Sequence, residues 1–368
     1  MIYSVRVPTP NVATEQLLDT PGRVRAGEEL DAAAVAQYLI AQDGSLTGLP
    51  EVRQFPGGAS NLTYLLGYRD RKLVLRRGPF GHKAKGAHDM VREARVMTAL
   101  GPAYPYVPRI VAVCDDDAVL GAPFYVMEHV PGIILRRDVP AELNLGKAEA
   151  RQLCLSVIDR LIELHRIDYV GAGLSHLGKG QGYVERQVSG WSDRYRRART
   201  GDVPDFEAVM HWLVQHKPVT EVAIAVIHND YRFDNVVLDP ATLTVRGVLD
   251  WEMATLGDPL MDLGNTLAYW CQADDDEIRR GMRRQPTHLA GMLTRAEVVA
   301  YYAERTGFQV PRFAFYEVYG LFRLAAILQQ IYYRYFHGQT QNTEFASFGK
   351  SVVYLEQACL RAIEADTP

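Results

Sequence analysis

The most informative stretch of this sequence runs His228-Asn229-Asp230-Tyr231-Arg232-Phe233-Asp234-Asn235. Asp230 is followed five positions later by Asn235, and the apolar run 236–238 comes next. A loop carboxylate can orient a hydroxyl group and take its proton, and an amide oxygen beside it can bind magnesium. The alternative is an Asx-rich turn in which both side chains only satisfy local backbone donors.

This spacing matches the H-x-D-x-x-x-x-N catalytic loop of kinases, with Asp230 as catalytic base. A second carboxylate supports the match, because the predicted strand 247–249 ends at Asp250, fifteen residues after Asn235. A hairpin would bring Asn235 and Asp250 together, so that their oxygens hold Mg²⁺ while ATP phosphates supply other ligands. The alternative for Asp250 is a helix cap, and capping or bracing of the loop is what we expect of Asp258 and Asp262.

Two upstream segments fit a nucleotide site. The segment 55–61, Phe-Pro-Gly-Gly-Ala-Ser-Asn, lies between two predicted strands, where glycines let the backbone approach phosphates; a plain Gly-Gly hairpin turn is the alternative. Alternation along the predicted strand Leu73-Val74-Leu75-Arg76 directs Leu73 and Leu75 to one face and Arg76 to the other. Kinases carry a strand lysine at the position of Arg76. Glu93 on the next predicted helix is its expected partner, although it could be a solvated surface residue.

The composition favours a small-molecule partner. The formal net charge is -4 and the pI is about 6.2, so no basic field exists to gather nucleic acid or an anionic membrane. The four cysteines lack CxxC or Cys/His spacing, which argues against zinc and against a disulfide scaffold. Without a signal peptide or a long apolar run, we expect a cytoplasmic protein. The oligomeric state stays open.

The order of patterns along the chain predicts an α+β fold. Residues 1–29 are expected to be an N-terminal extension. Within 30–130, a short helix at 30–41, strands across 50–77, a helix at 87–100 and two more strands predict a small antiparallel lobe that binds nucleotide. Long helical patterns dominate 131–368, interrupted by a β-like stretch at 226–250. We expect this larger lobe to hold the catalytic loop, the metal site and the acceptor pocket.

These motifs together resemble the aminoglycoside phosphotransferase and choline kinase superfamily, because HND is followed by LDW and no D-F-G or A-P-E occurs. Within it, the sequence is most similar to the phosphotransferase domain of acyl-CoA dehydrogenase family members ten and eleven. The shared stretches are YLLGYRDRKLVLRRGP, REARVM, YVERQVSGW and FRLAAILQQIYYR. The resemblance covers about residues 30–340 and implies a protein-kinase-like fold of two lobes, a small sheet-containing one and a larger helical one.

The resemblance also implies roles for particular residues. Arg76 and Glu93 would orient the phosphates, and His228 would brace the catalytic loop through hydrogen bonds. His165 is expected to be a packed structural histidine. The residues expected to cover the phosphates are Gly57, Gly58 and Ser60. Those expected to form the hinge that binds adenine through backbone groups are Met127, Glu128, His129 and Val130.

The function that follows is ATP- and Mg²⁺-dependent phosphorylation of a hydroxyl on a small molecule, and the resemblance makes a 4-hydroxyacyl-CoA a candidate acceptor. Arginines in DRYRRAR (193–199) and IRRGMRR (278–284) could meet CoA phosphates or form solvated helix faces. The aromatic-rich helix containing Arg323 could line the acceptor pocket, although core packing explains most of its pattern. The alternatives are a kinase for aminoglycosides or other hydroxylated metabolites, and a nucleotide-binding pseudokinase.

Overall fold

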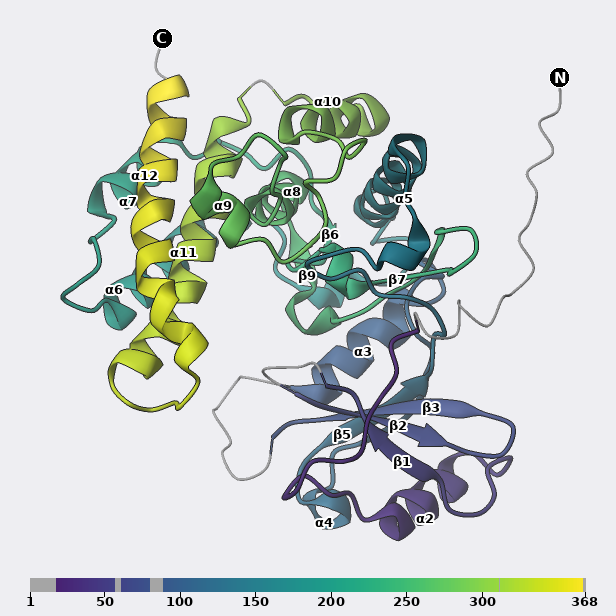
Figure 1. Ribbon diagram of the computed structural model, residues 1–368. Helices are drawn as coiled ribbons and strands as arrows, with labels where there is room; N and C mark the ends of the chain where they lie inside the picture. Colours follow the sequence, from purple (N-terminus) through teal and green to yellow (C-terminus); the bar gives the residue numbers. More distant parts are fainter. Residues whose placement is uncertain (1–17, 57–60, 80–88, 311, 367–368) are drawn as a thin grey trace, which may run out of the picture. The chain divides into compact units, whose positions relative to one another are not determined.

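The computed structural model describes residues 18–56, 61–79, 89–310 and 312–366 (Figure 1). Within these ranges the chain forms two compact units. The first combines Met1–Ile134 with Ala172–Leu174 and Asn235–Ala254, and the second comprises Leu135–Gly171, Ser175–Asp234 and Thr255–Pro368. The candidate catalytic loop therefore contributes Asp230 to the second unit and Asn235 to the first.

The first unit is built on a five-stranded antiparallel sheet with strand order β1-β2-β3-β5-β4 (Figure 1). Its strands are β1 (Glu51–Gln54), β2 (Leu62–Gly67), β3 (Lys72–Arg77), β4 (Ile110–Cys114) and β5 (Phe124–Glu128). Its helices are α2 (Ala32–Gln42), α3 (Met90–Leu100) and the short α4 (Asp117–Leu120). A further hairpin of β7 (Val236–Leu238) and β8 (Val245–Val248) precedes the single turn η4 (Trp251–Met253).

Alternation along the strands sends side chains to two different faces of this sheet. Tyr64 of β2 is paired with Leu75 of β3, and both side chains lie on the face that packs against α2. There they form one apolar core with Val35 and Leu39 of α2. Arg76 is the next residue along β3 and so points to the opposite face. The helix α3 packs against β4 and β5, and Figure 1 shows α2 and α3 on opposite sides of the sheet. The sheet thus directs Arg76 toward the α3 side.

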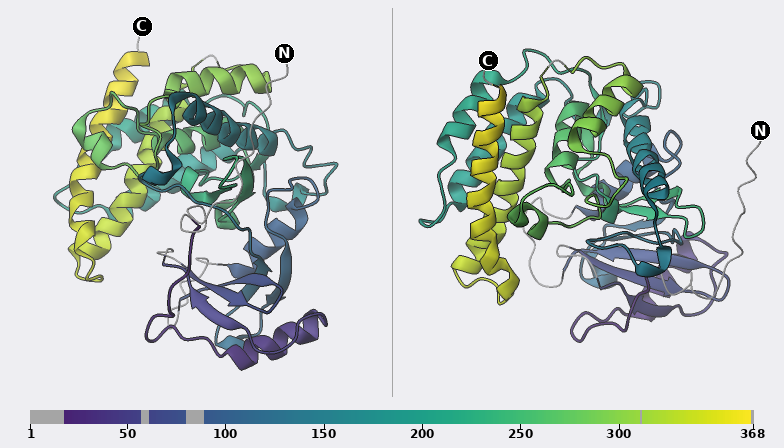
Figure 2. Two further views of the ribbon diagram at one scale, coloured as in Figure 1. Left: turned by 45° about the vertical axis from the view of Figure 1, so that its right-hand side comes forward. Right: turned by 45° about the horizontal axis from the view of Figure 1, so that its top comes forward.

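The second unit is mainly helical, as Figure 2 shows in two further views. Its helices are α5 (Lys147–His165), α6 (Tyr183–Ala198), α7 (Glu207–His216), α8 (Pro259–Ala268), α9 (Glu277–Gly281), α10 (Arg295–Thr306), α11 (Ala314–Phe336) and α12 (Phe348–Asp366). The single turns are η1 (Ala141–Leu143), η2 (Ser175–Leu177) and η5 (Thr343–Ser347), together with the first two residues of η3 (Phe233–Asn235). The strands β6 (Ala225–Ile227) and β9 (Thr255–Gly257) pair antiparallel.

The long helix α11 is the centre of this unit, packing against α6, α8 and α12. Gly264 of α8 and Gly320 of α11 bring two backbones together: a Cβ atom built on Gly320 would lie 2.2 Å from the carbonyl oxygen of Gly264. Only glycine permits so close an approach. Every residue of α11 from 315 to 326 except Glu317 is buried, so core packing explains the pattern in this half of the helix.

The predicted α+β kinase-like fold, with a small antiparallel sheet and a larger helical part, is confirmed. The helix expected at 30–41 is observed at Ala32–Gln42, and the β-like stretch 226–250 consists of short strands and turns. The short helix α4 was not expected. None of the helices in the described part of the chain is long and apolar enough to cross a membrane.

Candidate active site

A buried ion-pair cluster lies on the α3 side of the sheet in the first unit. Arg76 donates from Nη1 to Glu93 Oε1 at 2.7 Å and from Nη2 to Asp250 Oδ1 at 3.0 Å. Arg76 Nη1 also lies 3.2 Å from the hydroxyl oxygen of Tyr125, the residue that pairs with Arg76 across β3 and β5. The predicted partnership between Arg76 and Glu93 is therefore present, and Asp250 joins it.

Burial sets the electrostatics of this cluster. Glu93 is fully buried, and its Oε2 has no hydrogen-bond partner among the described residues. Burial raises the pKa of Glu93 to about 7, although the positive charge of Arg76 opposes this shift. Glu93 Oε1 also accepts the backbone N–H of Trp251 at 3.1 Å. The carboxyl group thus fixes both the strand arginine and the segment that follows Asp250.

This burial predicts a pH dependence of stability. A folded-state pKa of about 7 lies above the ordinary 4.5, so the folded protein binds this proton more tightly than the unfolded chain. The stabilisation is complete below pH 4.5 and is lost as the pH rises through 7, a difference on the order of 3 kcal/mol. Urea unfolding at pH 5 and pH 8 should show a smaller pH-dependent loss for Glu93→Gln than for the unmodified protein, and equal losses would contradict the assignment.

The two predicted metal ligands flank the β7–β8 hairpin at its open end, Asn235 directly before β7 and Asp250 two residues after β8. The backbone N–H of Leu249 donates to the carbonyl oxygen of Asn235 at 2.8 Å, so the hairpin closes directly beside Asp250. Asp250 has φ 69°, a left-handed conformation that is costly for a residue other than glycine and that is common at functional sites. Arg92 of α3 holds the next turn by donating to the carbonyl oxygens of Glu252 and Ala254.

The donor chemistry of this hairpin fits magnesium. Asp250 offers a partly exposed carboxylate and Asn235 a side-chain amide, both hard oxygen ligands. Mg²⁺ commonly takes one or two protein ligands and completes its shell with water and substrate phosphates. Among the described residues no group of three or more His, Cys, Asp and Glu side chains could hold a metal ion.

The catalytic-loop residues belong to the second unit, where Asp262 of α8 anchors them. Its carboxylate accepts the backbone N–H groups of His228 at 2.7 Å and Asn229 at 2.8 Å, and it lies 3.1 Å from Nε2 of His165. Burial alone would raise the pKa of Asp262, but these hydrogen bonds, above all that from His165, hold it below its ordinary value. His165 is buried and its Nδ1 is hydrogen-bonded to Tyr302, as expected of a structural histidine.

Asn229 holds the catalytic loop in a backbone conformation that few residues other than glycine adopt. Its φ of 66° lies in the left-handed region, which glycine adopts freely and asparagine better than most other residues. The side-chain oxygen of Asn229 accepts a hydrogen bond from the Tyr183 hydroxyl at 2.9 Å. The backbone carbonyl oxygen of Asn229 accepts another from Arg323 at 2.9 Å. Arg323 is buried and lies over the Trp191 ring, so it positions the loop.

Arg232 is an arginine of this loop that the sequence analysis did not single out. Its guanidinium lies 3.4 Å from Asp230 Oδ2 and 3.2 Å from Asp234 Oδ1, and it packs over the Tyr269 ring at 4.6 Å from the centroid. The aromatic ring and the two carboxylates therefore fix Arg232, which in turn restrains Asp230. The backbone N–H of Asp230 donates to Nδ1 of His228 at 3.2 Å, as expected of a bracing His228.

We predict that Asp262→Ala strongly destabilises the protein. It would leave the buried N–H groups of His228 and Asn229 without partners, which should lower the free energy of unfolding by about 3 kcal/mol. Asp31→Ala is the matched control, because it removes only the exposed N-cap of α2 and should cost about 1 kcal/mol. Urea unfolding measures both, and similar losses would show that Asp262 does not anchor the loop.

The remaining sequence predictions fall on two segments. Gly57, Gly58 and Ser60 lie outside the described residues. Of the predicted hinge, Met127 and Glu128 end strand β5, and the N–H of Glu128 donates to the carbonyl oxygen of Arg109. The N–H of His129 donates to the carbonyl oxygen of Lys72, and its ring stacks on Phe55. No hydrogen bond of the Val130 N–H is found within the described ranges.

The sheet with its arginine–glutamate pair and the helical unit with its anchored loop define a kinase-like protein. The chain belongs to the phosphotransferase enzyme family, abbreviated APH, whose model matches residues 51–298. It is 34% identical over 95% of its length to acyl-CoA dehydrogenase family member 10 of Mus musculus and 32% identical over 89% to family member 11 of Homo sapiens. The chain spans only 34% and 42% of those two relatives.

Three solved structures illustrate the similarity of this fold to that of other proteins. A Ralstonia eutropha protein described as an aminoglycoside phosphotransferase is 29% identical, with a TM-score of 0.79, and the match covers 92% of this chain and 100% of that one. Choline kinase of Cryptosporidium parvum matches with a TM-score of 0.58 at 11% identity, over 86% and 89% of the two chains. APH(4)-Ia, in a ternary complex with AMP-PNP and hygromycin B, matches with a TM-score of 0.57 at 14% identity, over 90% and 99%. The last two similarities show the fold alone.

Proposed function

We propose that this protein transfers the γ-phosphoryl group of ATP, with Mg²⁺, to a hydroxyl group of a small molecule. The main support for this function is that the guanidinium of Arg76 contacts both Glu93 and Asp250. Kinases use this combination of a strand cation, a helix glutamate and a metal-binding aspartate to orient ATP phosphates. Arginine in place of lysine keeps the charge and can grip phosphate through two hydrogen bonds.

Each candidate residue then has one role. Asp230 accepts a hydrogen bond from the acceptor hydroxyl and takes its proton as the new oxygen–phosphorus bond forms and the bond to ADP breaks. Arg76, held by Glu93, orients the phosphates, which Gly57, Gly58 and Ser60 would cover. The hinge 127–130 would bind adenine. Since Glu128 and His129 use their N–H groups within the sheet, we assign the adenine hydrogen bond to the N–H of Val130.

Asn235 and Asp250 would hold the metal, since both offer hard oxygen ligands. Bound Mg²⁺ would neutralise charge on the transferred phosphoryl group. The hairpin and the turn held by Arg92 keep Asp250 in place. Binding of the phosphates then requires little reorganisation of the protein. The known complex of APH(4)-Ia with AMP-PNP, an ATP analogue, supports ATP as the donor.

The acceptor we propose is a 4-hydroxyacyl-CoA. Its support is the similarity to relatives named as acyl-CoA dehydrogenase family members, of which this chain matches about a third to two fifths. Incubation with ATP, Mg²⁺ and a panel of hydroxyacyl-CoAs and aminoglycosides, with ADP release measured, tests the assignment. Turnover should require a hydroxyacyl-CoA, and the non-hydroxylated acyl-CoA of equal length is the matched control.

Two other outcomes identify the alternatives. Turnover with an aminoglycoside, together with resistance conferred on a sensitive host, would show an aminoglycoside kinase. Purified protein that binds Mg²⁺-ATP but transfers phosphate to no acceptor, including water, would be a pseudokinase. The contact of Arg76 with Glu93 and Asp250 argues for an active enzyme, because it retains the charge arrangement that phosphoryl transfer needs.

A further inference from the structure

A pocket of about 410 Å³ lies in the second unit between α8, α9, α11 and the start of α12. Such a volume is within the range of small-molecule sites. Tyr269 forms part of its wall, and the same ring carries Arg232, which is ion-paired with Asp230. The pocket is therefore connected to the proposed base through two side chains of its own unit.

Positive charge dominates the lining of this pocket. The cationic lining residues are Arg137, Arg279, Arg283, Arg284 and Lys350, and among the residues that the structure describes Glu344 is the one carboxylate of the lining. Arg279 is buried and donates to the carbonyl oxygen of Ala268, so its role is structural. Arg283 is held by Asp138. Arg284 and Lys350 are exposed, and no ion pair among the described residues involves either of them. These two exposed cations are available to an anionic ligand.

The remaining wall is apolar. The apolar lining residues are Ile278, Met282, Leu324, Leu328 and Phe348. Ile278 is 57% exposed, so its side chain is accessible to a ligand. Cations beside an apolar surface suit a molecule that carries phosphate or carboxylate groups next to a hydrocarbon chain. A polycationic aminoglycoside would meet like charge here, which is costly.

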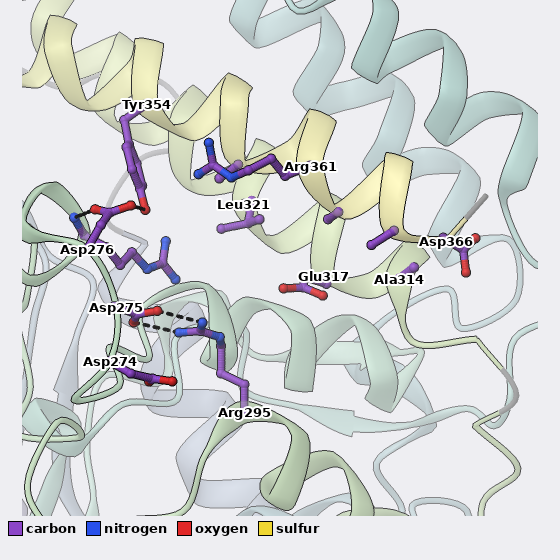
Figure 3. A pocket seen from close by; sticks show the side chains of 14 residues that line it. Asp274, Asp275, Asp276, Arg295, Ala314, Glu317, Leu321, Tyr354, Arg361 and Asp366 are labelled. Atoms are coloured by element: carbon purple, nitrogen blue, oxygen red, sulfur yellow. Dashed lines mark hydrogen bonds and ion pairs between the residues drawn. The ribbon is translucent and has the colours of Figure 1, made fainter. Parts of the chain in front are cut away.

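A neighbouring pocket of about 500 Å³ has the opposite balance of charge (Figure 3). There Arg295 makes two hydrogen bonds to Asp275, Tyr354 donates to Asp276, and Arg361 lies over the Tyr354 ring. Five carboxylates line that pocket, namely Asp274, Asp275, Asp276, Glu317 and Asp366. It therefore has no excess of positive charge for an anion.

We propose that the pocket lined by Arg284, Lys350 and Ile278 is the acceptor site, and that it selects an anionic molecule with an apolar chain. Arg284 and Lys350 bind the anionic groups, and Ile278 with Phe348 contacts the chain. This inference rests on the proposed phosphotransferase function but concerns binding alone. The segment IRRGMRR supplies most of the α9 side of this pocket. In DRYRRAR, by contrast, Arg194 packs on Trp191 and Arg196 pairs with Glu207.

Calorimetry with three probes tests the proposal: octanoyl-CoA, coenzyme A without the chain, and octanoyl-pantetheine without the nucleotide phosphates. The double variant Arg284→Glu/Lys350→Glu should weaken binding of octanoyl-CoA and coenzyme A at least tenfold and leave octanoyl-pantetheine unchanged. Ile278→Ser should weaken the two octanoyl probes about threefold or more and leave coenzyme A unchanged. All three positions are exposed, so folding should survive, and melting temperatures check this.

Arg361→Glu is the matched control, because it reverses an exposed cation in the neighbouring pocket and should change no probe's affinity. Unchanged octanoyl-CoA affinity in the double variant, or no binding of any probe by the unmodified protein, would overturn the proposed site. Mg²⁺-ATP affinity, measured on the same preparations, should stay constant in every variant. A result against the acceptor site therefore leaves the phosphotransferase function untouched. Absence of ATP turnover would instead contradict the proposed function.

Discussion

Asp230→Asn should lower kcat by a factor of about 10² or more while nucleotide affinity stays near that of the unmodified protein. Asparagine keeps the shape and one acceptor oxygen of the side chain but cannot take the proton of the acceptor hydroxyl. A residual rate is expected, because phosphoryl transfer depends mainly on positioning and electrostatics. Calorimetry for nucleotide binding and phosphate transfer for turnover, on one preparation, measure the two effects separately.

Asp234→Asn provides the matched control for this experiment. Asp234 shares the ion pair with Arg232 and lies in the same loop, but the proposed mechanism gives it no proton to accept. It should keep more than a tenth of the activity. Near-normal turnover of Asp230→Asn would remove Asp230 from the mechanism, and an equal loss in both variants would show that the ion pairs of Arg232 matter more than the basicity of Asp230.

Asp250→Asn should abolish turnover and weaken Mg²⁺-dependent nucleotide binding at least tenfold. It removes a full negative charge from the metal site and weakens the contact with Arg76 Nη2. Asn235→Ala should act in the same direction but less severely, because it removes a neutral ligand. Nucleotide titrations at several Mg²⁺ concentrations measure both.

Asp239→Asn controls for damage to the hairpin. Asp239 lies in the turn between β7 and β8 and pairs with Arg246, so its substitution changes an acidic side chain of the same hairpin without touching the proposed ligands. Its Mg²⁺ dependence should match that of the unmodified protein. An unchanged Mg²⁺ dependence in both Asp250→Asn and Asn235→Ala would mean that the metal is bound elsewhere.

Local sequence patterns predicted the elements that position these residues. Alternation in 73–76 correctly placed Arg76 and Leu75 on opposite faces of the sheet. The pairing of Arg76 with Glu93 follows from the predicted helix, which begins at Met90. Asp258 caps α8 and Asp262 braces the loop, as expected of both. Such features are readable because capping and alternation depend on neighbours within a few residues.

Long-range contacts could not be read in this way. The hairpin 235–254 belongs to the first unit because Leu238 pairs with Ile133 and Val248 donates to Tyr106, contacts across more than a hundred residues. One lobe boundary between residues 130 and 131 therefore does not match the two compact units. The roles of the lobes in nucleotide binding and catalysis stay predictions. The contact of Arg76 with Asp250 and the packing of Arg232 on Tyr269 likewise join segments with no shared periodicity.

Phosphoryl transfer is measured by following the γ-phosphoryl group of ³²P-labelled ATP in the presence of Mg²⁺ and a 4-hydroxyacyl-CoA. Transfer by this protein should place label on the acyl-CoA acceptor with stoichiometric ADP and leave the non-hydroxylated acyl-CoA unlabelled, and Asp230→Asn should reduce it about 10²-fold. Protein that binds labelled ATP and Mg²⁺ yet leaves all the label in ATP, with every hydroxyl acceptor offered, would contradict the proposed function.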